Sequence, residues 1–286
     1  MIYDCFTFFN ELELLEIRLN ILNNYVDKFV IVESNWTHAG KTKELHFEKN
    51  KHLFEKFLPK IIHVIVEDKP PIIENSWTFE RFQRNAILRG LSNLKKEDRI
   101  IVSDVDEIPS PSAIDKYKEE HSITIFKQKM FYYYLNCINS GKNSETYNWC
   151  GSTMCSFEFF ETPQDLRDIS ISYLGLQTGN WKSKVVFVLN WINDKRLRKH
   201  KIKLAEDGGW HFSYLGGTKR IIEKLEAFAH QEYNLEKYKN PTAIEQAIRD
   251  GKDLFGRGFT YRFIEIDSTF PSYIIQNQTK FIELIR

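Results

Sequence analysis

The first hundred residues alternate between short apolar runs and amphipathic segments, and this alternation constrains the fold more than any other feature. A mostly apolar run over 2–9 is followed by leucines that recur at steps of three and four residues, which predicts a strand and then a helix. Three further runs, 28–33, 61–66 and 100–103, predict strands, with a helix over 76–91 before the last of them. Near-continuous apolar strands that alternate with helices indicate an α/β protein with a mostly parallel sheet covered on both faces.

A different pattern begins near residue 123. Aromatic and β-rich segments lie at 123–136 and 184–192, and the polar stretch at 139–153 between them predicts a loop. Helical patterns return at 218–230 and 242–250. We therefore expect a Rossmann-like core over residues 1–217 and a helical C-terminal extension over residues 218–286 that packs on it. For the helix over 76–91, Ser76 or Thr78 is the expected N-cap.

Charge and composition exclude several classes of function. The 286 residues carry a formal net charge of +1, so no bulk field attracts nucleic acid or an anionic membrane. Four cysteines without a C-x-x-C pair indicate neither a zinc knuckle nor a disulfide framework. The N-terminal segment has no basic start, and acidic residues interrupt its apolar residues, so we expect a soluble, cytoplasmic protein without a transmembrane segment.

The stretch RIIVSDVDEIP, residues 99–109, carries an apolar run directly into three carboxylates, Asp104, Asp106 and Glu107. In an extended segment side chains alternate, so Asp104 and Asp106 are expected on one side, where they could share a cation. Such an oxygen site suits Mg²⁺ or Mn²⁺, which keep open positions for phosphates. A solvated turn is the plain alternative.

A second chemistry also uses D-x-D at a strand end. In haloacid-dehalogenase-type phosphatases the first Asp is a nucleophile and the second an acid or base, usually near the N-terminus. Here the cluster follows a hundred residues and reads DVDEI, which disfavours a phosphatase.

Polar residues follow two other predicted strands at the same rim, where parallel sheets bind ligands. Asn10 and Glu11 end the first strand and Glu33 the second, so all three are candidates for contacts with a ligand. Glu11 could equally complement a helix dipole. Lys41 lies in a polar loop after a glycine and is a further candidate for a phosphate contact.

Several segments together resemble the glycosyltransferase family of β-1,4-mannosyl-glycoprotein β-1,4-N-acetylglucosaminyltransferase and its microbial relatives. In the family's order, they are YDCFTFFNELELLEIRL, VIVESNWTHAGK, ERFQRNAI, SDVDEIP, GWHFSYLGG, KLEAFAHQE and GKDLFGR. The resemblance implies a GT-A-like fold and an inverting transfer from UDP-GlcNAc or a related UDP-sugar to a glycan acceptor, with Mn²⁺ (or Mg²⁺). The Golgi enzymes carry an N-terminal membrane anchor that this sequence lacks, which favours a bacterial or viral glycan as the acceptor.

The resemblance also implies roles for residues in the metal site. Asp106 is expected to bind the metal directly, and Asp104 to bind the metal or the ribose. Glu107 is a weaker candidate for the metal, and a supporting position behind the ligands is its alternative. His211 in GGWHFS matches the late histidine of GT-A sites, although a histidine packed in the core is an equal alternative.

Donor and acceptor chemistry need further groups. Arg84 and Asn85 match an Arg-Asn pair that faces the nucleotide in GT-A enzymes, and the alternative for Arg84 is an i,i+4 ion pair with Glu80. Inversion requires a general base, for which Asp207 is our expectation. Glu206 and Glu158 remain open, as does an ordinary loop role for Asp207. A protein that binds nucleotide sugar or glycan without turnover is the alternative function.

Overall fold

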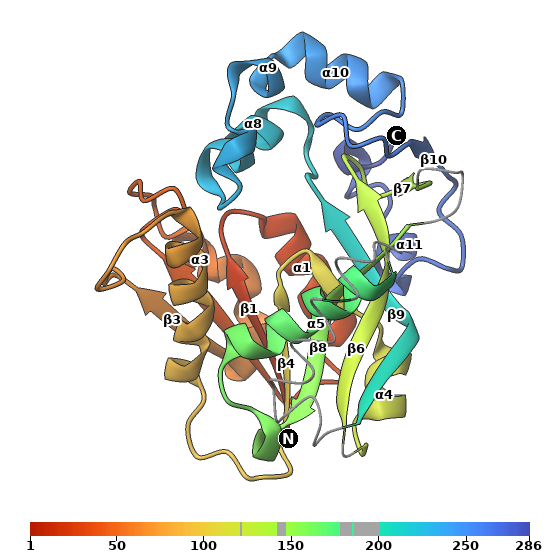
Figure 1. The fold of residues 1–286 in the computed structure, drawn as a ribbon. Helices are drawn as coiled ribbons and strands as arrows, with labels where there is room; N and C mark the ends of the chain where they lie inside the picture. Colours follow the sequence, from red (N-terminus) through yellow and green to blue (C-terminus); the bar gives the residue numbers. More distant parts are fainter. Residues whose placement is uncertain (121, 142–146, 178–184, 186–200) are drawn as a thin grey trace.

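The computed structural model describes residues 1–120, 122–141, 147–177, 185 and 201–286. The strand that the sequence predicts over 184–192 lies outside these residues apart from Val185. In the described part, ten strands form one sheet, in the order β10-β7-β6-β8-β4-β1-β2-β3, while β9 pairs with β5 and β6. Helices flank this large, curled sheet, so the α/β prediction is confirmed (Figure 1).

The N-terminal half contains the predicted parallel strands. They are β1 (Ile2–Phe8), β2 (Lys28–Ser34), β3 (Ile61–Val66) and β4 (Arg99–Asp104). The helical segments of this half are α1 (Leu12–Leu22), α2 (His46–Asn50), η1 (Lys51–Lys60), α3 (Ser76–Asn85) and η2 (Ala86–Gly90). All neighbouring pairs among these four strands are parallel. Their carboxyl ends therefore meet at one rim, as the sequence predicts.

Alternate residues of β1 divide between two apolar clusters, one on each face of the sheet. Phe6 packs with Leu15 and Phe29 on the face covered by α1, and Cys5 packs with Val30 and Ile87 on the opposite face. All these residues are fully buried. Burial on both faces explains why the strand reads as a nearly continuous apolar run.

Six more strands extend the sheet beyond β4, in antiparallel pairs except for β6 and β9, which pair in parallel. They are β5 (Glu107–Pro109), β6 (Ile123–Tyr132), β7 (Cys137–Asn139), β8 (Asn148–Ser156), β9 (Ile202–Ser213) and β10 (Tyr261–Phe263). The expectation of a loop over 139–153 is wrong at its end, because β8 lies between β4 and β6. Small polar residues make this strand read as a loop in the sequence. One of them, Ser152, is satisfied by a tertiary contact, because its Oγ donates to the Glu107 carbonyl at 3.0 Å.

The remaining helical segments lie beside or above the sheet (Figure 1). They are α4 (Pro111–Tyr117), η3 (Phe157–Phe159), α5 (Pro163–Gln177), α8 (Gly217–Ala227), η4 (Gln231–Tyr233), α9 (Glu236–Lys239), α10 (Pro241–Arg249), α11 (Ser272–Gln276) and η5 (Ile282–Leu284). Figure 1 shows α8, α9 and α10 over the end of the sheet to which the arrows of β1, β6 and β9 point. The segment 218–286, predicted as helical, also supplies β10, which pairs with β7.

Helix α3 begins one residue earlier than a cap at Ser76 would require. Its N-cap is Asn75, whose side chain accepts from the Trp77 backbone N–H at 3.0 Å. Thr78 completes a capping box with its hydroxyl oxygen facing the Asn75 backbone N–H. The predicted caps Ser76 and Thr78 are therefore wrong, because both already lie inside the helix. No helix in the described ranges is long and apolar enough to cross a membrane.

Candidate active site

A tight turn joins β4 to β5 and carries the three carboxylates. Asp104 ends β4, Val105 and Asp106 form the turn, and Glu107 begins β5. The expectation that Asp104 and Asp106 alternate along an extended segment is wrong, because the chain turns between them. The side chain of Asp104 is 33% exposed and that of Asp106 is 7% exposed. Each carboxylate consequently has its own cationic partners.

Arg18, a buried residue of α1, holds this turn in place. Its Nε and Nη2 donate to the two carboxylate oxygens of Asp4 at 2.8 and 2.6 Å. Nη2 also donates to Ser103 Oγ, and Nη1 donates to the carbonyl oxygens of residues 104, 105 and 107 at 2.9, 3.3 and 2.9 Å. One side chain thus connects β1 and α1 to the backbone of the acidic turn.

Two guanidinium groups hold the carboxylate of Asp104. Arg84 Nη2 from α3 donates to Oδ1 at 3.1 Å, and Arg167 Nη2 from α5 donates to Oδ2 at 3.0 Å. Burial opposes ionisation of Asp104, but Arg167 and Arg84 outweigh it and hold the pKa of Asp104 well below its usual value. Arg84 also pairs with Glu80 at 2.6 Å, so the predicted i,i+4 pair is confirmed alongside the contact with the acidic turn.

The partners of Asp106 come from later in the chain. Lys224 Nζ from α8 donates to Oδ2 at 2.9 Å, and His211 Nε2 from β9 lies 3.6 Å from Oδ1. Burial again opposes ionisation, but the Lys224 ammonium and the imidazole lower the pKa of Asp106. Asp106 and Glu11 in turn overcome the effect of burial on Lys224 and raise its pKa, so the ammonium stays charged.

Both carboxylate oxygens of Glu107 accept hydrogen bonds from the acidic turn and its neighbours. Its Oε2 accepts from the Asp104 backbone N–H at 2.9 Å and from Arg167 Nη1 at 2.6 Å. Its Oε1 accepts from Trp149 Nε1 at 2.6 Å and from Arg167 Nη2 at 2.7 Å. Fully engaged and 1% exposed, Glu107 fixes the orientation of Arg167 and of the turn.

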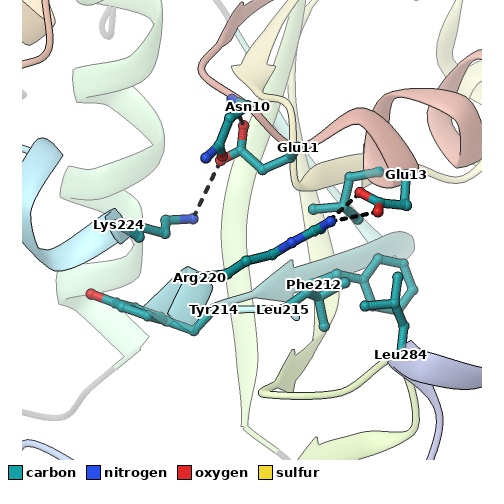
Figure 2. Close-up of a pocket in the computed structure, with 10 residues that line it drawn as sticks. Asn10, Glu11, Glu13, Phe212, Tyr214, Leu215, Arg220, Lys224 and Leu284 are labelled. Carbon is teal, nitrogen blue, oxygen red and sulfur yellow. Dashed lines mark hydrogen bonds and ion pairs between the residues drawn. The ribbon is translucent and has the colours of Figure 1, made fainter. Parts of the chain in front are cut away.

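Asn10 and Glu11 lie at the same rim beside a small pocket (Figure 2). Glu11 Oε2 accepts from the backbone N–H groups of Phe9 and Asn10, and its Oε1 lies 3.9 Å from Lys224 Nζ. Asn10 Nδ2 donates to Glu223 at 3.4 Å. The structure therefore brings the end of β1 next to the partner of Asp106.

Three other residues that are expected to contact the donor lie at structural positions or at the surface. Glu33 is fully buried, and its carboxylate accepts from the backbone N–H groups of Phe47 and Glu48 at the start of α2. Asn85 Oδ1 accepts from the Gln164 backbone N–H at 3.0 Å, which joins α3 to α5. Lys41 is exposed in the loop after β2. Their predicted donor contacts stay predictions, and this geometry favours Arg84 over Asn85 and Glu33.

The candidate general bases lie away from the acidic turn. Asp207 is exposed on β9, four residues before His211, in a bulge where Ala205 pairs with Phe126 and Gly209 with Gln128. Glu206 is exposed and pairs with Lys127 at 2.6 Å. Glu158 is exposed beyond β8, whose last residue pairs with the first residue of β4 at the opposite rim. The role of Asp207 therefore rests on the resemblance alone.

Asp106 and His211 fit a divalent ion better than Asp104 does. Ligand bonds of about 2.1 Å let two ligands of one ion lie about 3 to 4 Å apart, and the Asp106 Oδ1 to His211 Nε2 distance is 3.6 Å. Both oxygens of Asp104 already accept from guanidinium groups. The described residues contain no group of three or more His, Cys, Asp or Glu side chains arranged for a metal, so other ligands would have to complete the coordination.

Three basic residues of the site were not identified from the sequence. Arg18 lies on the apolar face of α1 and Lys224 in the segment KLEAFAHQE, so both stand in segments that carry the family resemblance. A charged residue in an apolar stripe, such as Arg18, is a readable signal, and so is Asp4 within an apolar strand. Arg167 has no such signal, because its partners come from distant strands.

Fold and site together define a mixed α/β protein with an acidic turn, lined by cations, at the carboxyl ends of its parallel strands. Residues 1–142 match the model of glycosyltransferase family 17, so the N-terminal half of this chain belongs to that family. The resemblance seen in the sequence is confirmed over this half.

Three curated relatives agree with the family assignment. Each is a beta-1,4-mannosyl-glycoprotein 4-beta-N-acetylglucosaminyltransferase, from Homo sapiens, Rattus norvegicus and Mus musculus. Each is 30% identical over 112 residues, which cover 37% of this chain and 21% of the relative. The matched part thus spans about a fifth of the length of these relatives.

Proposed function

We propose that this protein transfers a sugar, N-acetylglucosamine in the first instance, from a UDP-sugar to a hydroxyl group of a glycan acceptor. The acidic turn carries the proposal: Asp104 and Asp106 lie at the carboxyl end of β4, inside the family match, with three cationic side chains on them. Open α/β sheets bind ligands at this rim. A diphosphate needs the concentration of positive charge found there.

Transfer with inversion sets two requirements. The leaving diphosphate must be neutralised as the glycosidic bond breaks, and a base must accept the proton of the acceptor hydroxyl. A divalent ion, Mn²⁺ or Mg²⁺, would supply part of the neutralisation when bound, and Asp106 and His211 would hold it. Arg84 and Lys224 contribute further positive charge, and Asp207 is the proposed base.

Nucleotide binding gives the first test. We would titrate UDP and UDP-GlcNAc calorimetrically, with and without Mn²⁺, into the wild type, Asp106→Ala and Asp106→Asn. Asp115→Ala is the matched control, because Asp115 is an exposed carboxylate on α4 paired only locally, with Lys118 at 2.9 Å. Metal-linked binding that both Asp106 variants lose and the control keeps supports the proposal. A folded wild type that binds neither nucleotide with Mn²⁺ overturns it.

Turnover separates a transferase from the binding protein that is its alternative. Release of UDP from UDP-GlcNAc in the presence of a glycan library would identify the enzyme. Loss of that release in Asp207→Asn, with nucleotide affinity unchanged, would support Asp207 as the base. Binding without release by any acceptor favours the non-catalytic alternative. Phosphate release from p-nitrophenyl phosphate would instead point to a phosphatase.

A further inference from the structure

Lys224 differs from the other cations of the site in how it is held. Arg84 donates to Glu80 and Gln164 as well as to Asp104, and Arg167 donates to Glu107 and the Gly151 carbonyl. Their side chains are 3% and 5% exposed, whereas that of Lys224 is 24% exposed. The two arginines are therefore parts of the framework, and Lys224 is the cation with freedom to move.

The ammonium of Lys224 lies between two carboxylates. It donates to Asp106 Oδ2 at 2.9 Å and lies 3.9 Å from Glu11 Oε1. Figure 2 shows the Lys224 side chain extending from α8 toward Glu11 and Asn10. The Tyr214 ring, 5.4 Å from Nζ, borders the lysine side chain as well. A flexible lysine stem lets the ammonium leave Asp106 without a displacement of α8.

Asp106 is also the carboxylate best placed to bind a divalent ion with His211. An ammonium on its second oxygen neutralises the charge that would attract the ion and repels the ion directly. Lys224 and the ion therefore compete for Asp106. A bound donor would offer the displaced ammonium a new acceptor, because phosphate oxygens bind lysine well.

We propose that Lys224 acts as an exchangeable cation. It neutralises Asp106 in the empty site, yields Asp106 to the divalent ion, and then binds the diphosphate of the donor. The inference rests on the proposed function for its second half, since it specifies how the same site receives a nucleotide sugar. The exchange predicts opposite effects of one substitution on two ligands.

Mn²⁺ alone is the first probe. Free Mn²⁺ is measured by electron paramagnetic resonance, without nucleotide, for the wild type, Lys224→Met and Lys224→Gln. We expect both neutral variants to bind Mn²⁺ about tenfold more tightly. In the wild type only a minority of molecules have Asp106 free of the Lys224 ammonium, whereas in the variants Asp106 is always free of it. Lys224→Arg should bind Mn²⁺ like the wild type. Lys219→Met is the control, because Lys219 is exposed on the same helix.

UDP is the second probe, titrated at saturating Mn²⁺. We expect Lys224→Met and Lys224→Gln to bind UDP about tenfold more weakly, because a charge-assisted contact with the diphosphate is lost. Circular dichroism confirms that each variant is folded, and the second neutral variant remains if the first does not fold. Tighter Mn²⁺ binding together with weaker UDP binding is the expected signature.

The outcomes separate the exchange from the function. If the wild type binds UDP, and the Mn²⁺ affinity of both neutral variants is unchanged or weaker, the exchange is overturned and the transferase proposal stays intact. Unchanged UDP affinity in those variants removes the second half of the exchange. A folded wild type that never binds UDP overturns the proposed function, and the Mn²⁺ titration still reports whether Lys224 competes for Asp106.

Discussion

Arg18→Met tests whether one buried guanidinium supports the acidic turn. Arg18 and Asp4 both have fully buried side chains, and the pair is joined at 2.6 Å. Removing one partner of a buried ion pair costs about 3–5 kcal/mol. The carbonyl oxygens at 104, 105 and 107 also lose their donor, at roughly 1 kcal/mol for each one that stays dry. We expect a loss of about 5 kcal/mol, against roughly 5–15 kcal/mol for a whole domain.

Urea denaturation followed by far-UV circular dichroism measures this loss as a change in the free energy of unfolding. Arg89→Met is the matched control, since Arg89 makes a similar two-pronged pair with Asp68 while their side chains are 41% and 55% exposed. That control should lose no more than about 1 kcal/mol. The double variant Asp4→Asn with Arg18→Met should regain part of the stability that the single variant loses, because no buried charge is left unpaired.

A loss below about 1 kcal/mol in Arg18→Met would refute the reasoning. It would mean that the turn keeps its conformation without the guanidinium or that water replaces its hydrogen bonds. A double variant no more stable than the single one would also count against it, since the buried charge of Asp4 would then not be the main cost.

Three further predictions concern stability and reactivity. Gly209→Ala should lower the free energy of unfolding, measured by urea denaturation, by at least about 2 kcal/mol, because φ of Gly209 is +125° and a Cβ there would lie 2.2 Å from the Ile108 carbonyl oxygen. Gly258→Ala is the control and should lower it less, because Gly258 has φ +85° and open space for a Cβ. Asn75→Ala should cost about 1 kcal/mol through loss of the cap of α3, measured as a lower Tm. Burial raises the pKa of the Cys150 thiol from 9.0 to about 11. The contribution of this thiol to the free energy of unfolding should therefore be constant below about pH 8 and fall as the pH rises from 9 toward 11. In native protein the buried thiol should not react with Ellman's reagent at pH 8.

The hydrophobic pattern was enough to predict the four parallel strands, because both faces of those strands are apolar. Periodicity did not predict strand β8, because buried Ser152 and Thr153 make the segment read as a loop. Their surroundings come from β6 and β5, which are distant in sequence: Gln128 Nε2 donates to Ser152 Oγ at 3.1 Å. A polar residue that is satisfied by tertiary contacts cannot be distinguished from a solvated one by local pattern.

The site was predictable where chemistry is local and unpredictable where it depends on assembly. Asp104 and Asp106 stand out because they follow an apolar strand, and Arg84 because it precedes that strand on a helix. Glu33 illustrates the opposite case, since its position at a strand end suggested a ligand contact, whereas its oxygens accept from the backbone at the start of α2. Only the folded chain reveals which carboxylates are already occupied.

The sequence separation between Asp106 and Lys224 has a consequence for synthesis. The contacts of Arg18 need only residues up to 107, whereas Arg167 and the strand β9 that pairs with β5 follow much later in the chain. Lys224 follows Asp106 by 118 residues, which take roughly 6 to 24 s to translate at about 5–20 residues per second. Asp106 is therefore made well before the cation that neutralises it, and β5 lacks its partner strand β9 for most of the same interval.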